Sequence, residues 1–173
     1  MIEDLWTQED ADLEQWRVAP LVELVVHLLE RYHLVARLEM ARLETLTEEA
    51  VLLEGAGRAE WLTLRDELAR FCRELRGHMA LEEQRLFPAI LELDRAYPQE
   101  VPEILPPLRR LLEDEHGAEI RLLRLLRHLA GNCVPDDRLC SVQARLQRSF
   151  HALERSLHRH IFLESQILFQ RIS

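Results

Sequence analysis

Glycine, proline and cysteine are scarce in this sequence, and their scarcity excludes several classes of protein. The 173 residues include 5 Gly, 7 Pro and 3 Cys. With 47% hydrophobic and 31% charged residues, the composition is that of a compact helical protein and not of a disordered one. The cysteines are odd in number and form no Cys-x-x-Cys pair. We therefore expect neither a disulfide framework nor a thiolate zinc site.

Long apolar runs and an excess of basic charge are also missing. No run of about 18 apolar residues occurs, so we expect no segment that spans a membrane. A net charge of −9 argues against nucleic acid as a partner, because neutralising phosphates requires a concentrated basic surface. The acidic N-terminus lacks the basic and apolar regions of a signal peptide. These absences predict a single cytoplasmic domain over residues 1–173.

Four long segments carry apolar residues at spacings of three and four, which is typical of helices. They cover residues 20–53, 59–93, 107–130 and 138–171. No alternating β-branched run predicts a strand. The sequence therefore predicts an all-α fold: an antiparallel, up-down-up-down four-helix bundle over residues 20–171. Residues 1–19, with Trp6 and Trp16, are expected to form a short N-terminal arm that packs on the bundle.

Each predicted helix places one histidine on its apolar stripe. These histidines are His33, His78, His116 and His160. In the first helix the stripe is expected to run through Val22, Val26, Leu29, Ala36 and Met40. Glu82 and Glu164 follow the second and fourth of these histidines by four residues, so each shares a helix face with its histidine. Six ionisable groups are thus predicted to face one core.

A bound cation would resolve the cost of burying these groups, since even one unpaired charge is strongly unfavourable in an apolar interior. Imidazole and carboxylate donors without thiolate favour iron, with manganese as the lesser alternative, over tetrahedral zinc. Six or seven inward donors fit two octahedral metals bridged by carboxylates. The other histidines fall on other faces of their helices and are not expected to bind metal. They are His27, His128, His151 and His158.

The segments around these donors resemble the signatures of hemerythrin-like proteins. His78-x3-Glu82 precedes Leu86-Phe87-Pro88, and His160-x3-Glu164 precedes Leu168-Phe169, much like the paired His-x3-Glu and Leu-Phe signatures of that family. Three further segments are similar to the branch involved in iron–sulfur cluster repair. They are Trp16–Pro20, Arg31-Tyr32-His33 and Glu113–His116. The similarity extends over roughly residues 14–171.

The resemblance implies a non-haem di-iron centre whose two iron ions are bridged by carboxylates and an oxo group. Its implied ligands are His33, His78, Glu82, His116, His160 and Glu164. It also implies that Glu74 and Glu115 line the approach to the site. Members of the family carry a further ligand histidine between the first two helices, where this chain has none, and ungapped counting places Glu54 there.

Glu54 follows His33 by 21 residues, or three heptads, so a continuous helix would return it close to the same face. We interpret it as a seventh ligand. The alternative is a solvated glutamate in the last helical turn.

The implied function is a role in nitrosative and oxidative stress. The di-iron centre would react with nitric oxide or peroxide and support the repair of damaged iron–sulfur proteins. Reversible binding or sensing of dioxygen or nitric oxide is the alternative, and a metal-free scaffold is a third reading. The sequence carries no hydrolase or transferase signature, which leaves redox activity as the open enzymatic possibility.

A second metal architecture also fits part of the sequence. Glu30-x-x-His33 and Glu113-x-x-His116 match the Glu-x-x-His pairs of ferritin-like di-iron bundles. That arrangement would leave His78 and His160 without a role. It would also leave the two matching Leu-Phe signatures unexplained, so we favour the hemerythrin-like arrangement.

Overall fold

The computed structural model describes residues 13, 15–54, 59–95, 103–132 and 140–172. Within these ranges the chain folds into four long helical stretches and no strand. The first comprises α2 (Leu21–His27), η3 (Leu28–His33) and α3 (Leu34–Glu54), and the second α4 (Ala59–Leu81), η4 (Glu82–Leu86) and α5 (Phe87–Arg95). The third is α6 (Leu105–Asn132), and the last comprises α7 (Cys140–Leu163), η5 (Glu164–Leu168) and α8 (Phe169–Arg171). The all-helical fold class is confirmed.

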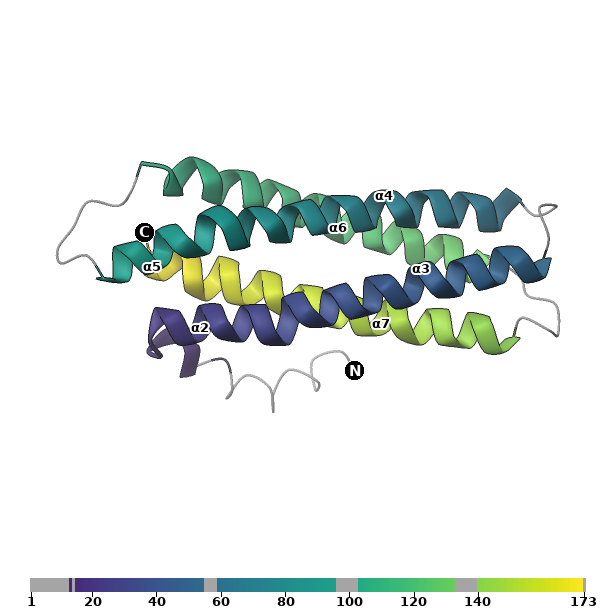
Figure 1. The fold of residues 1–173 in the computed structure, drawn as a ribbon, viewed down its shortest axis with the longest axis horizontal. Coiled ribbons are helices and arrows are strands. Elements are labelled where there is room, and N and C mark those ends of the chain that lie inside the picture. The colour runs from purple at the N-terminus through teal and green to yellow at the C-terminus, as the bar shows by residue number, and fades with distance from the viewer. Residues whose placement is uncertain (1–12, 14, 55–58, 96–102, 133–139, 173) are drawn as a thin grey trace.

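The four stretches lie side by side along one long axis, and consecutive stretches begin at opposite ends of it (Figure 1). The contacts agree with this picture, since α3 packs against α4 and α7, and α6 packs against α4 and α7. The start of the first stretch, α2, also contacts the end of the second, α5. A short turn of 3-10 helix, η2 (Gln15–Arg17), precedes the bundle.

The third helix begins earlier than the sequence predicted. We expected it to start at residue 107, but it starts at Leu105, so that Pro106 and Pro107 both lie in the first turn of α6. Proline is compatible with that position, because the first N–H groups of a helix have no intrahelical partner. Its fixed backbone angle also suits a helix start.

Three of the four stretches contain a segment of π-helix: η3, η4 and η5. A π turn holds more residues than an α turn, so it shifts the faces of the helix on either side of it. This shift corrects our expectation for the first helix. Val22 and Val26, predicted to face the core, are 44% and 43% exposed, while Leu24 and Leu28 are fully buried.

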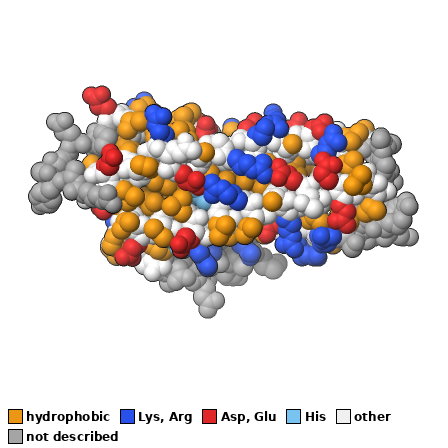
Figure 2. All heavy atoms as spheres, viewed as in Figure 1, with side chains coloured by type: hydrophobic (Ala, Val, Ile, Leu, Met, Phe, Trp, Pro, Cys, Tyr) orange, Lys and Arg blue, Asp and Glu red, His pale blue; other side chains and the backbone are white. Residues whose placement is uncertain are grey.

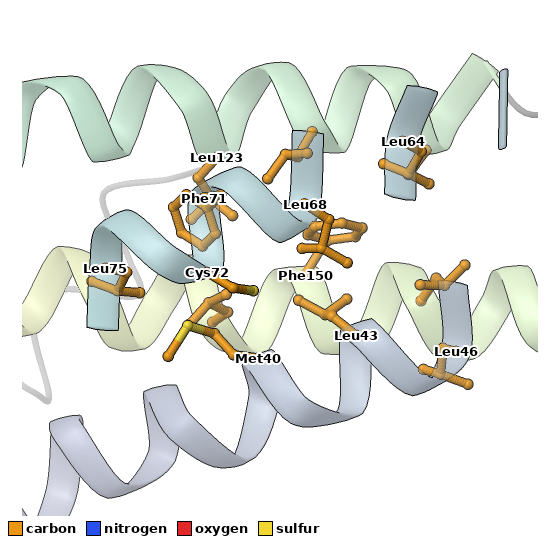
Figure 3. Close-up of a cluster of buried hydrophobic side chains, with 14 of the residues drawn as sticks. Met40, Leu43, Leu46, Leu64, Leu68, Phe71, Cys72, Leu75, Leu123 and Phe150 are labelled. Carbon is orange, nitrogen blue, oxygen red and sulfur yellow. The ribbon is translucent and has the colours of Figure 1, made fainter. Parts of the chain in front are cut away.

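The apolar core consists of two clusters. The first gathers side chains of α3, α4, α6 and α7, among them Met40, Leu68, Phe71 and Phe150 (Figure 3). The second gathers side chains from the other end of the four stretches, such as Leu28. In every stretch the predicted ligand residues lie near the boundary between the positions that supply the two clusters.

The surface carries charges of both signs. Figure 2 shows acidic and basic side chains intermixed over the face that it presents. No helix in the described ranges is both long and apolar enough to cross a membrane. This finding agrees with the absence of long apolar runs noted in the sequence.

Truncating the core should reveal the contribution of the first cluster to stability. Because Phe150 is fully buried, we expect Phe150→Ala to lower the free energy of unfolding by about 3–5 kcal/mol. Leu52 is 81% exposed, so Leu52→Ala should change it by less than about 0.5 kcal/mol. Urea titrations of samples with equal metal content measure both values. Equal midpoints for the two variants would contradict the assignment of this cluster as the core.

Candidate metal centre

Three of the predicted ligands lie at the places where a helix changes between α and π geometry. His33 is the last residue of π segment η3, and Glu82 and Glu164 are the first residues of η4 and η5. π-Helical turns frequently occur at functional sites. His78 and His160 each precede their glutamate by one turn, and the third helix, α6, supplies His116.

These six side chains converge into two groups of four that share both glutamates. His33 and His160 form the first group with Glu82 and Glu164, and His78 and His116 form the second group with the same two glutamates. Within each group, one donor atom per residue lies within 4.8 Å of the others. All six residues are buried, and both glutamates have no exposed surface. Each group could hold a metal ion.

Each glutamate directs one oxygen to each group. Glu82 has Oε2 3.2 Å from Nε2 of His33, and Oε1 2.9 Å from Nε2 of His78. Glu164 has Oε1 3.1 Å from Nε2 of His160, and Oε2 3.1 Å from Nε2 of His116. Both carboxylates therefore lie between the two histidine pairs.

Nε2 of His33 and Nε2 of His160 lie 3.3 Å apart, within hydrogen-bond distance, but most of the other buried ligand atoms of this cluster are unpaired. All four oxygens of Glu82 and Glu164 are buried without a hydrogen-bond partner, as are Nε2 of His78 and both ring nitrogens of His116. The short distances between them thus lack the alignment of hydrogen bonds. Unpaired buried donors that converge in this way suit a cation, because a cation accepts lone pairs from all of them at once.

Burial sets the electrostatics of the glutamate pair. It raises the pKa of Glu82 well above the ordinary value, and the neighbouring Glu164 carboxylate raises it further. Burial acts in the same direction on Glu164, but His160 and His116 together outweigh it and lower the pKa of that carboxyl well below its usual range. Without a cation, the pair therefore favours a proton on Glu82.

Outer carboxylates contact two of the histidines on the side away from the cluster. Nδ1 of His33 lies 2.7 Å from Oε1 of Glu83, which also accepts a 2.7 Å hydrogen bond from Arg37. Nδ1 of His78 lies 2.9 Å from Oε2 of Glu115. A carboxylate at Nδ1 fixes the tautomer in which the Nε2 lone pair is free to bind a metal.

Glu119 adds a second carboxylate beside His78. Its Oε1 lies 3.5 Å from Nδ1 of His78, and its side chain is almost completely buried. Burial raises the pKa of Glu119 to about 7, although His78 acts to lower it. Glu74, predicted to line the approach, is exposed on α4 and influences Glu119 through its charge.

Sequence reasoning missed Glu83 and Glu119. Glu119 follows Glu115 by four residues and His116 by three, so helical spacing could have placed it near the site. Glu83 directly follows Glu82, and adjacent residues do not normally share a helix face. No periodic signal indicated its contact with His33.

The histidines expected to be non-ligands lie outside both groups. His151 is exposed, and Nδ1 of His158 lies 2.8 Å from the backbone oxygen of Glu154. His27 stacks on Trp16 instead. The ferritin-like alternative does not fit either, because Glu30 is exposed while His78 and His160 belong to the cluster.

Our interpretation of Glu54 as a seventh ligand is wrong. Helix α3 is continuous from Leu34 to Glu54. A rise of about 1.5 Å per residue puts the Glu54 backbone roughly 30 Å along the axis from His33. The two residues share a heptad position, but α3 ends at the opposite end of the bundle from α2 (Figure 1). The side chain of Glu54 itself lies outside the described part of the structure.

Comparison with known proteins gives the family that the sequence motifs resemble. Residues 24–172 match the Hemerythrin HHE cation binding domain. The iron–sulfur cluster repair protein YtfE of Escherichia coli O81 (strain ED1a) is 30% identical over 160 residues, which are 91% of this chain and 69% of that protein. Its counterpart in Escherichia fergusonii is 29% identical over the same shares. The chain therefore belongs to the hemerythrin family of cation-binding domains.

Proposed function

We propose that this protein holds two iron ions, one in each group of four donors, and uses them in iron–sulfur cluster repair under nitrosative or oxidative stress. The observation that carries the proposal is the position of Glu82 and Glu164. Each glutamate directs one carboxylate oxygen to one histidine pair and the other oxygen to the second pair. Each carboxylate is therefore suited to bridge two metals. Two histidines and two carboxylate oxygens per metal favour iron over structural zinc.

Four protein donors per metal leave positions of an octahedral ion open. An oxo group would bridge the oxidised pair, and small diatomic or peroxide ligands would take the remaining positions. Bound iron supplies one-electron redox chemistry and affinity for such ligands. The protein's contribution is to hold the imidazoles of His33 and His78 in the metal-binding tautomer and to exclude bulk water. Glu83 and Glu115 serve the first task, and the apolar clusters on either side serve the second.

The role in repair is supported by the relatives, whose name describes them as iron–sulfur cluster repair proteins. Damaged iron–sulfur proteins are therefore the proposed partners. The binding of nitric oxide or peroxide at the iron pair is the chemistry proposed for that role.

Metal content tests the ligand assignment. We expect about two iron ions per chain, as the two groups of donors predict, and near-ultraviolet absorption from an oxo-bridged ferric pair. His78→Ala and His160→Ala should each lose iron, because each removes one donor and leaves the neighbouring carboxylates less neutralised. His151→Ala, at an exposed histidine, is the matched control and should retain iron. Elemental analysis measures all four proteins, and full iron content in both ligand variants would refute the assignment.

The contact between His33 and Glu83 can be tested separately. Glu83→Gln should weaken metal binding by about 10–100-fold, because the amide no longer fixes the tautomer of His33. Glu49, which forms a 3.2 Å ion pair with Arg145 on the surface, provides the control Glu49→Gln. Competition with a chelator measures both affinities. Equal affinities would show that Glu83 only forms a surface ion pair.

Small-molecule binding tests the functional part of the proposal. The reduced, iron-loaded protein should bind nitric oxide and give no long-lived dioxygen adduct, as expected for repair rather than storage. Absorption spectra recorded during anaerobic nitric oxide addition, and separately during admission of air, measure the two reactions. A stable and reversible dioxygen adduct would assign the protein to storage or sensing.

A further inference from the structure

A row of aromatic rings leads from the edge of the bundle to the metal centre. The indole of Trp16 stacks on the imidazole of His27, with ring centroids 4.3 Å apart and planes inclined by 27°. His27 meets Tyr32 edge-on at 5.4 Å. Tyr32 stacks on His160 at 6.1 Å, with planes inclined by only 14°. The first three rings are half-buried and His160 is buried, so the row runs from the surface inward.

The outer end of this row is held in place. The backbone oxygen of Trp16 accepts a 2.8 Å hydrogen bond from Arg171 at the end of the last helix. The amide of Ala19 donates a 2.9 Å hydrogen bond to Gln15 and closes the turn around Trp16. Trp16 and Tyr32 both pack against the second apolar cluster. The contacts among the rings therefore belong to the packed bundle.

The row has a composition suited to redox chemistry, since it contains two side chains that can lose an electron, indole and phenol. We propose that Trp16, His27 and Tyr32 form a one-electron relay between the protein surface and the metal centre, which the relay enters at His160. This inference rests on the proposed function, because it needs an iron pair that meets peroxide. The relay would serve when peroxide reaches iron that is already ferric and cannot supply the electrons itself.

Reduction of one hydrogen peroxide to two waters needs two electrons and two protons. Tyr32 gives one electron and its phenolic proton toward the centre. The phenoxyl radical takes an electron from the Trp16 indole through the His27 ring and a proton from water. Trp16 recovers its electron from a one-electron donor in solution, such as ascorbate, which releases the matching proton. Two such passes reduce one peroxide and oxidise two ascorbate ions by one electron each.

His27 is suited to its place between the two oxidisable rings. Burial lowers its pKa, and the positive charge of Arg31 lowers it further, against the opposing effect of Glu30. The ring is therefore neutral at physiological pH and does not repel the positive charge that forms when Trp16 loses an electron.

Trp61 offers an internal comparison for the oxidation of Trp16, because it is buried in the first apolar cluster on α4 and has no place in the row.

The experiment treats the iron-loaded protein with hydrogen peroxide, with and without ascorbate. Radicals are detected by electron paramagnetic resonance in frozen samples, and oxygen addition to Trp16 and Trp61 by peptide mass spectrometry. In the parent protein we expect a tyrosyl radical and oxidised Trp16, both lost in the presence of ascorbate, with Trp61 unmodified. Zinc-loaded protein is the control for peroxide acting without redox-active metal and should show neither product.

Two variants locate the path. Tyr32→Phe keeps a ring beside His160 but should lose both the radical and Trp16 oxidation. His27→Ala removes the ring between the other two, so Trp16 oxidation should be lost while the tyrosyl radical remains. Equal Trp16 oxidation in the parent and both variants would overturn the relay, as would its absence from the parent. If the parent binds iron and consumes peroxide, only the relay is overturned; if it binds no iron, the proposed function fails with it.

Discussion

The structure depends on one electrostatic constraint: six ionisable side chains are buried together where four helices meet. Apolar clusters lie on both sides of them along the bundle, and the outer carboxylates Glu83 and Glu115 reach only His33 and His78. The atoms of Glu82, Glu164 and His116 that face one another are left without hydrogen bonds. Such an arrangement is unfavourable for a protein that binds nothing, because each unpaired buried group retains its desolvation cost. The same arrangement is favourable around cations.

Much of the fold and most of the donor set followed from periodicity. Apolar spacing gave the four helical stretches, and the four-residue step from His78 to Glu82 placed both on one face. Periodicity has two limits, however. It describes rotation about a helix and not position along it. Periodicity therefore predicted that Glu54 lies near His33, although the whole length of α3 separates the two residues. It also assumes a constant turn, and the π segment before His33 broke that assumption for Val22 and Val26.

Contacts between helices were beyond what one sequence could indicate. Glu83 reaches His33 across a helix interface, and no local pattern in either helix specifies that pairing. Glu83 beside His33 is paired with Arg37. Glu119 beside His78 instead lies near the carboxylates of Glu115 and Glu74, both of which add to the effect of burial in raising its pKa. The two histidine pairs therefore have different charge environments. An ion bound by His78 and His116 would experience a more negative field than one bound by His33 and His160.

The donors also come from distant parts of the chain, and this has a consequence for folding. His33 and His160 approach within 3.3 Å although 127 positions separate them. Closing so long a loop carries an entropic cost that only the assembled bundle repays. A metal bound by both residues would act as a reversible cross-link between the first helix and the last. Because its ligands meet only in the assembled bundle, the metal would bind after folding and would not nucleate it. Its binding energy would add to the barrier against unfolding.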